Sequence, residues 1–217
     1  CWRVSSGTAA VLELHHLRMD AAPTTAYLML GERCSRNCAF CTQARESRSS
    51  AAALSRVIWP QFPDGQVATA IARAYHEGTI RRACFQVTVS HGYLAEAAQA
   101  VTTLVQACDV PICVSVAPRN TEDVGRLLAA GAQRVTIALD AACERVYERV
   151  KGGTWSSTLA LLTESARLYP GHIGTHLIVG LGETEREMAE RIQELHDLGV
   201  TIGLFSFTPV SGTALAG

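Results

Sequence analysis

The chain has 217 residues, of which 48% are hydrophobic and 18% charged, and its formal net charge is -1. This length suits one sizeable domain, and the composition supplies enough apolar surface for a folded core. The near-zero charge without a basic stripe excludes typical nucleic-acid binders, and no apolar run approaches the ~20 residues of a membrane span. We therefore expect a cytoplasmic protein that binds neither nucleic acid nor membrane.

Apolar segments rich in β-branched residues alternate with helical patterns from residue 24 onward. The predicted strands cover residues 24–30, 82–90, 111–117, 134–140, 172–180 and 201–209. The predicted helices cover residues 66–77, 94–107, 122–130 with Thr121 as the cap, 156–168 and 185–198. Such alternation is typical of βα units in a parallel sheet.

Six βα units are too few for a closed eight-stranded barrel. We therefore predict an α/β fold, a partial (β/α)6 barrel of the TIM type with parallel strands and an active site that faces the lumen. The barrel domain covers residues 24–217, and residues 1–23 form an N-terminal extension.

Polar residues occupy alternate positions in the predicted strands. Side chains switch faces at every residue, so Cys84 and Gln86 share one face of the second strand while Phe85 and Val87 share the other. The third and fourth strands show the same division. Apolar side chains fill an ordinary barrel lumen, and an unpaired buried polar group costs about 1 to 3 kcal/mol. The polar faces therefore indicate that the lumen holds a polar ligand.

Three cysteines, Cys34, Cys38 and Cys41, follow the first predicted strand. The carboxyl ends of parallel strands are where such barrels build active sites. The chain has eight cysteines and can bury a core, which favours metal binding over a disulfide framework. A closed zinc site needs four ligands, and no second cysteine pair is present, whereas an iron–sulfur cluster with three thiolates keeps one open position for catalysis.

The array C-x-x-x-C-x-aromatic-C, with Phe40 in the aromatic position, resembles the cysteine loop of radical S-adenosylmethionine (SAM) enzymes. In that superfamily the three cysteines hold a 4Fe-4S cluster, and SAM completes the coordination of the fourth iron. Cleavage of SAM then gives a 5'-deoxyadenosyl radical. The resemblance implies that Cys34, Cys38 and Cys41 are the catalytic cluster ligands. It also implies an electron donor such as ferredoxin or flavodoxin.

The segment LIVGLGET, residues 177–184, is similar to the fifth-strand glycine motif of biotin and lipoyl synthases. This resemblance implies that Ile178 contacts adenine and that Gly180 and Gly182 let the backbone approach the nucleoside. A glycine turn before a helix capped by Thr184 and Glu187 would explain the same residues without a ligand.

The segment LDA, residues 139–141, resembles the fourth strand of biotin synthases, which implies that Asp140 lies near the ribose hydroxyls of SAM. The second strand departs from the family because it lacks the usual Gly-Gly-Glu. Contact with the methionyl amine would then fall to Thr88, Ser90 or backbone carbonyls.

Biotin synthase carries an auxiliary 2Fe-2S cluster, its sulfur donor, on cysteines from the second, third and fifth strands. Cys84 and Cys113 match the first two of these positions, but Gly174 replaces the third cysteine. A complete site of the biotin synthase type is therefore absent. An auxiliary iron–sulfur cluster at Cys84 and Cys113 is one hypothesis, and two small buried thiols are the other. Candidates for the missing ligands are Cys143, His176 and Arg134.

Most of the chain resembles small biotin-synthase-like proteins that act in pairs as a two-component lipoyl synthase. The resemblance implies sulfur insertion into octanoyl chains on a lipoyl carrier protein or an octanoyl-lysyl peptide, together with a second radical SAM subunit. Biotin synthase, or another radical SAM enzyme without sulfur insertion, is the alternative among enzymes. A non-catalytic iron–sulfur or zinc module is the alternative from another class.

Overall fold

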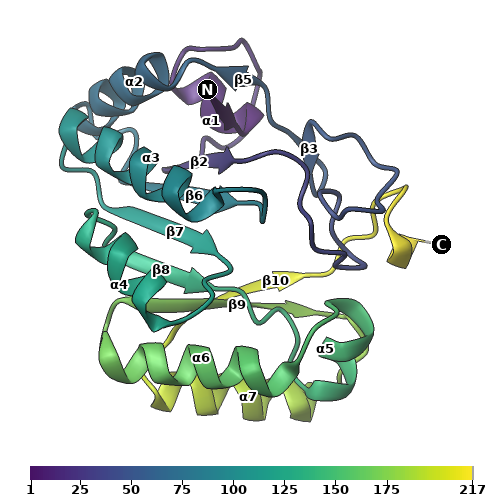
Figure 1. Cartoon of the computed structure of the whole chain (residues 1–217). Helices are drawn as coiled ribbons and strands as arrows, with labels where there is room; N and C mark the ends of the chain where they lie inside the picture. Colours follow the sequence, from purple (N-terminus) through teal and green to yellow (C-terminus); the bar gives the residue numbers. More distant parts are fainter. Residues whose placement is uncertain (217) are drawn as a thin grey trace.

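Six parallel strands make up most of an eight-stranded sheet in the computed structural model, which describes residues 1–216 (Figure 1). They are β2 (Thr25–Leu30), β6 (Arg82–Val87), β7 (Ile112–Val116), β8 (Arg134–Ile137), β9 (Ile173–Val179) and β10 (Thr201–Ser206). Their order in the sheet follows their order in the chain, so each crossover joins neighbouring strands. All six predicted strands are confirmed, and most end earlier than predicted.

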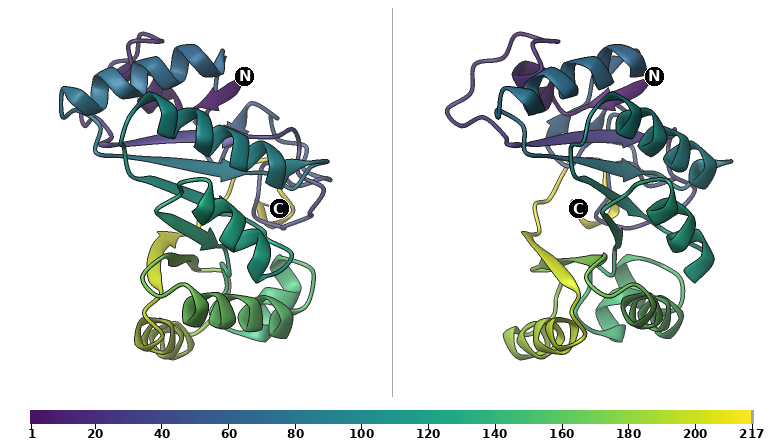
Figure 2. Two further views of the ribbon diagram at one scale, coloured as in Figure 1. Left: turned by 60° about the vertical axis from the view of Figure 1, so that its left-hand side comes forward. Right: turned by 90° about the vertical axis from the view of Figure 1, so that its left-hand side faces the viewer.

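Five longer helices cover the outer face of the curved sheet (Figures 1 and 2). They are α2 (Asp64–His76), α3 (Tyr93–Ala107), α4 (Thr121–Ala129), α6 (Trp155–Leu168) and α7 (Glu185–Asp197). The predicted capping box of α7, Thr184 with Glu187, is confirmed. The predicted cap of α4 is wrong, because the side chain of Asn120, not that of Thr121, accepts the hydrogen bond from the Asp123 amide.

Several short elements escaped the sequence analysis. Helix α5 (Glu144–Val150) lies between β8 and α6, and a hairpin of β3 (Ala53–Leu54) and β4 (Val57–Ile58) lies in the long segment after β2. A 3-10 turn, η1 (Ala214–Ala216), follows β10. Elements of two to seven residues carry too few side chains for a periodic pattern to show.

The N-terminal segment adds strands to the same sheet. Strand β1 (Trp2–Val4) pairs antiparallel with β2, and β5 (Gln61–Phe62) pairs antiparallel with β1. Helix α1 (Ser6–Val11) follows β1. The Trp2 ring packs edge-on against Phe85 with centroids 5.1 Å apart, so residues 1–23 contribute to the core of the barrel domain.

The two faces of the sheet differ as the alternation predicts. Phe85, Val114 and Val135 are fully buried under the helices. The opposite face carries Cys84, Cys113 and other polar residues and forms the concave side. Among residues 1–216, strand β10 pairs only with β9 and β5 only with β1, so the sheet forms the predicted partial barrel and does not close (Figure 2). No helix within residues 1–216 is both long and apolar enough to cross a bilayer.

Candidate functional site

The start of the loop after β2 is held against Thr88, the residue directly after β6. Gly31 has a positive φ of 80°, and a Cβ there would lie 2.5 Å from Oγ1 of Thr88, so the chain can turn here only with glycine. The Thr88 hydroxyl lies 3.0 Å from the carbonyl oxygen of Leu30 and 2.6 Å from that of Glu32. Thr88 lines the cysteine cavity, but its hydroxyl hydrogen is used to hold the loop.

The three loop cysteines line one cavity of about 180 Å³. The thiol of Cys34 accepts a hydrogen bond from the Val89 amide at 3.3 Å, and the Cys41 amide donates to the carbonyl of Cys38 at 3.0 Å. All eight cysteines are free thiols. Within residues 1–216 no three His, Cys, Asp or Glu side chains converge on a site for one metal ion. A four-iron cluster binds each thiolate through a different iron, so its ligands stand apart around one cavity.

Burial keeps the thiols of Cys38 and Cys41 protonated in the metal-free protein. It raises the pKa of Cys41 to about 12. It also raises the pKa of Cys38, against the opposing effect of the nearby Lys151 ammonium. Binding of iron displaces the thiol protons and neutralises the charge that burial disfavours, so soft metal ions suit this donor set. These residues fit an iron–sulfur cluster.

Lys151, directly after α5, lies in the same cavity and was missed by the sequence analysis. Its ammonium is 2.8 Å from Oδ2 of Asp140 and 2.5 Å from the carbonyl oxygen of Ala138. Its own carbonyl oxygen accepts a hydrogen bond from the Cys38 thiol at 3.9 Å. One signal could have drawn attention to it, because Lys151 is the only lysine beside 18 arginines in the chain.

Asp140 lies where β8 ends and bridges to β9. Its amide donates to the carbonyl of His176, and its carbonyl accepts from the amide of Ile178, both at 2.8 Å. Its φ is +64°, a left-handed conformation that costs roughly 1 to 2 kcal/mol for a residue with a side chain. This backbone directs the carboxylate to the lumen and to Lys151. The predicted contact with ribose remains a prediction.

A second cavity, of about 570 Å³, occupies the lumen of the partial barrel. It shares Cys41, Gln86 and Ser115 with the cysteine cavity, so a ligand bound at the cysteines can extend into the lumen. Its wall includes Phe40, Cys84, Cys113, Arg134, Asp140, His176 and Ile178.

Cys84 and Cys113 are register partners on the adjacent strands β6 and β7, and both are buried in the lumen wall. The side-chain amide of Gln86 donates to the Cys84 sulfur at 3.2 Å, and the Cys113 sulfur lies 3.3 Å from Oγ1 of Thr136. A hydrogen bond between the two thiols lowers the pKa of Cys113 and raises that of Cys84. One thiolate therefore forms readily at Cys113, while a second is disfavoured.

The candidates for a third ligand differ in position. Arg134 and His176 line the lumen, whereas Cys143 caps the start of α5 outside it. Nε of Arg134 is buried and has no hydrogen-bond partner among the described residues. A Cβ at Gly174 would lie 3.0 Å from Oγ1 of Thr136 and 3.1 Å from Cδ of Arg134. A side chain at this fifth-strand position would therefore press on Thr136 and Arg134.

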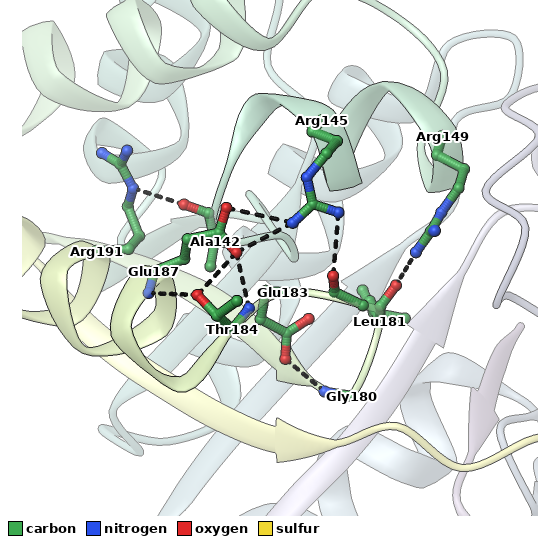
Figure 3. Close-up of polar contacts among 10 residues, drawn as sticks. Ala142, Arg145, Arg149, Gly180, Leu181, Glu183, Thr184, Glu187 and Arg191 are labelled. Atoms are coloured by element: carbon green, nitrogen blue, oxygen red, sulfur yellow. Dashed lines mark hydrogen bonds and ion pairs between the residues drawn. The ribbon is translucent and has the colours of Figure 1, made fainter.

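The glycine segment after β9 forms a turn that α5 holds in place (Figure 3). The Gly180 amide donates to Oε1 of Glu183 at 2.6 Å, and Arg145 donates to the carbonyl of Gly182 at 3.1 Å. Gly182 has a φ of +111°, and a Cβ there would collide with the guanidinium of Arg149. Turn geometry thus accounts for both glycines, and their contact with a nucleoside remains a prediction.

Ser90 does not join the lumen residues. It lines a separate cavity together with Gly31 and Glu96. Strand β6 ends at Val87, so the alternation that predicted the direction of Ser90 stops before it. The predicted contact of Ser90 with the methionyl amine of SAM remains a prediction.

Comparison with known proteins identifies the family. The model of the radical SAM superfamily matches residues 28–195. Lipoyl synthase 2 of Thermosynechococcus vestitus is 26% identical in an alignment of 195 residues that covers 84% of this chain and 65% of that protein. The chain therefore spans somewhat less than two thirds of this relative.

Two solved structures share the fold. Methylornithine synthase (PylB) has a TM-score of 0.73 at 10% identity, covering 98% of this chain and 71% of that one. The FeFe-hydrogenase maturase HydG of Carboxydothermus hydrogenoformans has a TM-score of 0.68 at 17% identity, and the match covers 88% of this chain and 46% of that one. The family match spans more than half of the chain and includes Cys34, Cys38 and Cys41, so the chain belongs to the radical SAM superfamily.

Proposed function

We propose that this radical SAM enzyme inserts sulfur at unactivated C–H positions of octanoyl chains, as a component of a lipoyl synthase. The observation that carries the proposal is the buried pair Cys84 and Cys113, which shares the lumen cavity with Cys41. A sulfur donor on this pair would face the space that is continuous with the cysteine cavity. The 26% identity to Lipoyl synthase 2 supports the same reaction class.

The cofactor roles follow from the two adjoining cavities. Cys34, Cys38 and Cys41 would hold the 4Fe-4S cluster, which with SAM supplies the 5'-deoxyadenosyl radical in this superfamily. Phe40 and Ile178, which line the adjoining lumen, would contact the nucleoside of SAM. An auxiliary iron–sulfur cluster would use the thiols of Cys84 and Cys113.

The proposed partners follow from the reaction. The substrate would be an octanoyl chain on a lipoyl carrier protein or an octanoyl-lysyl peptide, and a second radical SAM subunit would complete the lipoyl synthase. Ferredoxin or flavodoxin would supply the electron. The similarity to Lipoyl synthase 2 is the finding that supports this choice of substrate.

The first experiment tests radical SAM activity. Protein reconstituted anaerobically with iron and sulfide, then reduced, should cleave SAM to 5'-deoxyadenosine. Cys38→Ala should abolish this cleavage, because it removes a cluster ligand. Unchanged cleavage in Cys38→Ala would exclude the cysteine loop as the cluster site.

The second experiment tests sulfur insertion. The double variant Cys84→Ala/Cys113→Ala should bind less iron and sulfide per chain than wild type while it keeps SAM cleavage. An octanoyl-lysyl peptide, offered with and without a second radical SAM protein, should gain sulfur only with the wild-type thiol pair. An unchanged iron and sulfide count in the double variant would exclude the auxiliary cluster.

A second candidate is a radical SAM reaction without sulfur insertion. The crowding at Gly174 favours it, because a third cysteine ligand there would press on Thr136 and Arg134. This candidate predicts that the variant lacking Cys84 and Cys113 retains the full wild-type iron content and full SAM cleavage.

A further inference from the structure

The distribution of basic residues singles out one position. The chain has 18 arginines and one lysine, Lys151. Arginines such as Arg119, Arg126 and Arg186 extend into solvent, whereas the side chain of Lys151 is only 7% exposed. An ammonium is a compact and strongly hydrated charge, and removing it from water is unfavourable unless the protein replaces its solvent contacts. The groups around Lys151 should therefore indicate the function of its buried charge.

The protein replaces only part of the solvation that the Lys151 ammonium loses on burial. Asp140 and the carbonyl of Ala138 accept hydrogen bonds from the ammonium, and the Tyr147 ring centroid lies 5.7 Å from Nζ. An ammonium has three hydrogens, and the described residues supply two acceptors for them. The third hydrogen is available to a ligand in the cysteine cavity, whose wall includes Lys151. A guanidinium carries five N–H groups in a planar fork and would leave more of them unpaired here.

The end of α5 is fixed directly to the cysteine loop. The amide of Ala39, which lies between Cys38 and Cys41, donates to the carbonyl of Val150 at 2.7 Å. On its other side, α5 is held to the turn after β9 by Arg145 and Arg149 (Figure 3). The ammonium is therefore held in a constant position relative to the three cysteines.

The two members of the ion pair face different cavities. Lys151 lines the cysteine cavity, whereas Asp140 lines the lumen cavity. The Lys151–Asp140 pair thus presents its positive end to the cysteine cavity.

We infer that Lys151 is a positioning residue that places a fixed positive charge beside the cluster and makes the cluster easier to reduce. Reduction adds an electron to a site that already carries three thiolates. A nearby positive charge favours the reduced form, and it does so more strongly in a buried site than in water. This inference rests on the proposed function in one respect, the binding of the cluster by Cys34, Cys38 and Cys41.

The test is a redox titration of the reconstituted protein, followed by the electron paramagnetic resonance signal of the reduced cluster. Lys151→Met should bind the same amount of iron and sulfide as wild type. Its equilibrium constant for one-electron reduction should fall about tenfold or more, which is a shift of about 59 mV to more negative potential. Lys151→Arg retains the charge and should lie between the two.

Arg36 provides a matched control. It lines the same cavity, but it is exposed to solvent. Because solvent and salt screen an exposed charge, Arg36→Met should shift the potential less than Lys151→Met, and the shift should shrink further at high salt. A potential in Lys151→Met equal to that of wild type, with the cluster intact, would overturn the inference.

A second measurement does not depend on a variant that folds. Protein labelled with ¹⁵N-lysine has one labelled ammonium, because the chain has one lysine. Its signal should shift when the cluster is assembled and broaden strongly when the cluster is reduced to its paramagnetic state. A signal unaffected by both steps would place Lys151 away from the cluster and refute its role. Failure of the wild type to assemble any cluster would instead refute the assignment of the three cysteines, and iron analysis alone distinguishes that outcome.

Discussion

The ammonium of Lys151 lies 2.8 Å from the carboxylate of Asp140, and this buried ion pair connects the two cavities of the site. Lys151 lines the cysteine cavity, and Asp140 lines the lumen. Burial lowers the pKa of Lys151, but Asp140 and Cys38 outweigh that effect and leave it above its ordinary value. The side chain of Lys151 is therefore a charged ammonium at neutral pH.

Removing one member of this pair should destabilise the protein more than removing both. Asp140→Asn leaves the buried ammonium unpaired, and we expect the free energy of unfolding of the metal-free protein to fall by about 3 to 5 kcal/mol. In the double variant Asp140→Asn/Lys151→Met the loss should be smaller, because no unpaired charge remains. Urea unfolding of the two single variants and the double variant measures this coupling. Strictly additive losses would contradict a direct ion pair.

Gly182→Ala should destabilise the turn after β9 for two reasons. The substitution forces a side chain into a φ of +111° and against the guanidinium of Arg149. Gly171→Ala is the matched control, since Gly171 has a φ of +80° but open space around its Cβ position. We expect the unfavourable φ to lower the free energy of unfolding of each variant by about 1 to 2 kcal/mol. The contact with Arg149 should lower it further in Gly182→Ala alone. Equal losses in thermal or urea unfolding would show that Arg149 moves aside freely.

Glu187 should make stability depend on pH in the acid range. Hydrogen bonds, first from the Thr184 amide and then from the Cys143 side chain, lower the pKa of Glu187 from 4.5 to about 2. Because the folded-state pKa lies below the unfolded one, the stabilisation is complete above pH 4.5 and disappears as the pH falls towards 2. Glu187→Gln should therefore be less stable than wild type near pH 6, and the difference should vanish near pH 2.

Glu190→Gln on the same helix is the control for this effect. Glu190 pairs with the exposed Arg186, and exposed pairs contribute little to stability. Urea unfolding across the pH range should show a much smaller change for this variant. A pH-independent difference between wild type and Glu187→Gln would contradict the hydrogen-bonded carboxylate.

Gly174→Cys should show whether Arg134 occupies the place of a third cysteine ligand. Alone, the new side chain would press on Thr136 and Arg134, and overpacking of this kind costs about 1 to 3 kcal/mol. Adding Arg134→Ala should recover part of the stability by opening the space. Iron per chain after reconstitution should then exceed that of the single variant. If the single variant is as stable as wild type, the crowding at Gly174 is not a real constraint.

The local features of this protein follow from the sequence. The spacing of Cys34, Cys38 and Cys41 lies within one loop, so no distant contact is needed to bring these residues to the end of β2. The division of Cys84 and Phe85 between the lumen and the core follows from the period of two in a strand. Ser90 lies beyond the end of β6, where this alternation no longer predicts the direction of a side chain, because it holds only while the backbone remains extended.

Hydrophobic periodicity and the cysteine motif are properties of short segments, so the six parallel strands, the partial barrel and the family could be predicted from the sequence. The position of Lys151 beside Cys38 could not, because 113 residues separate the two along the chain. The close approach of Thr136 and Arg134 to Gly174 on the neighbouring strand is likewise visible only in the folded domain. Such contacts depend on strand register and helix docking, which result from packing over the whole domain and leave no periodic pattern in the chain.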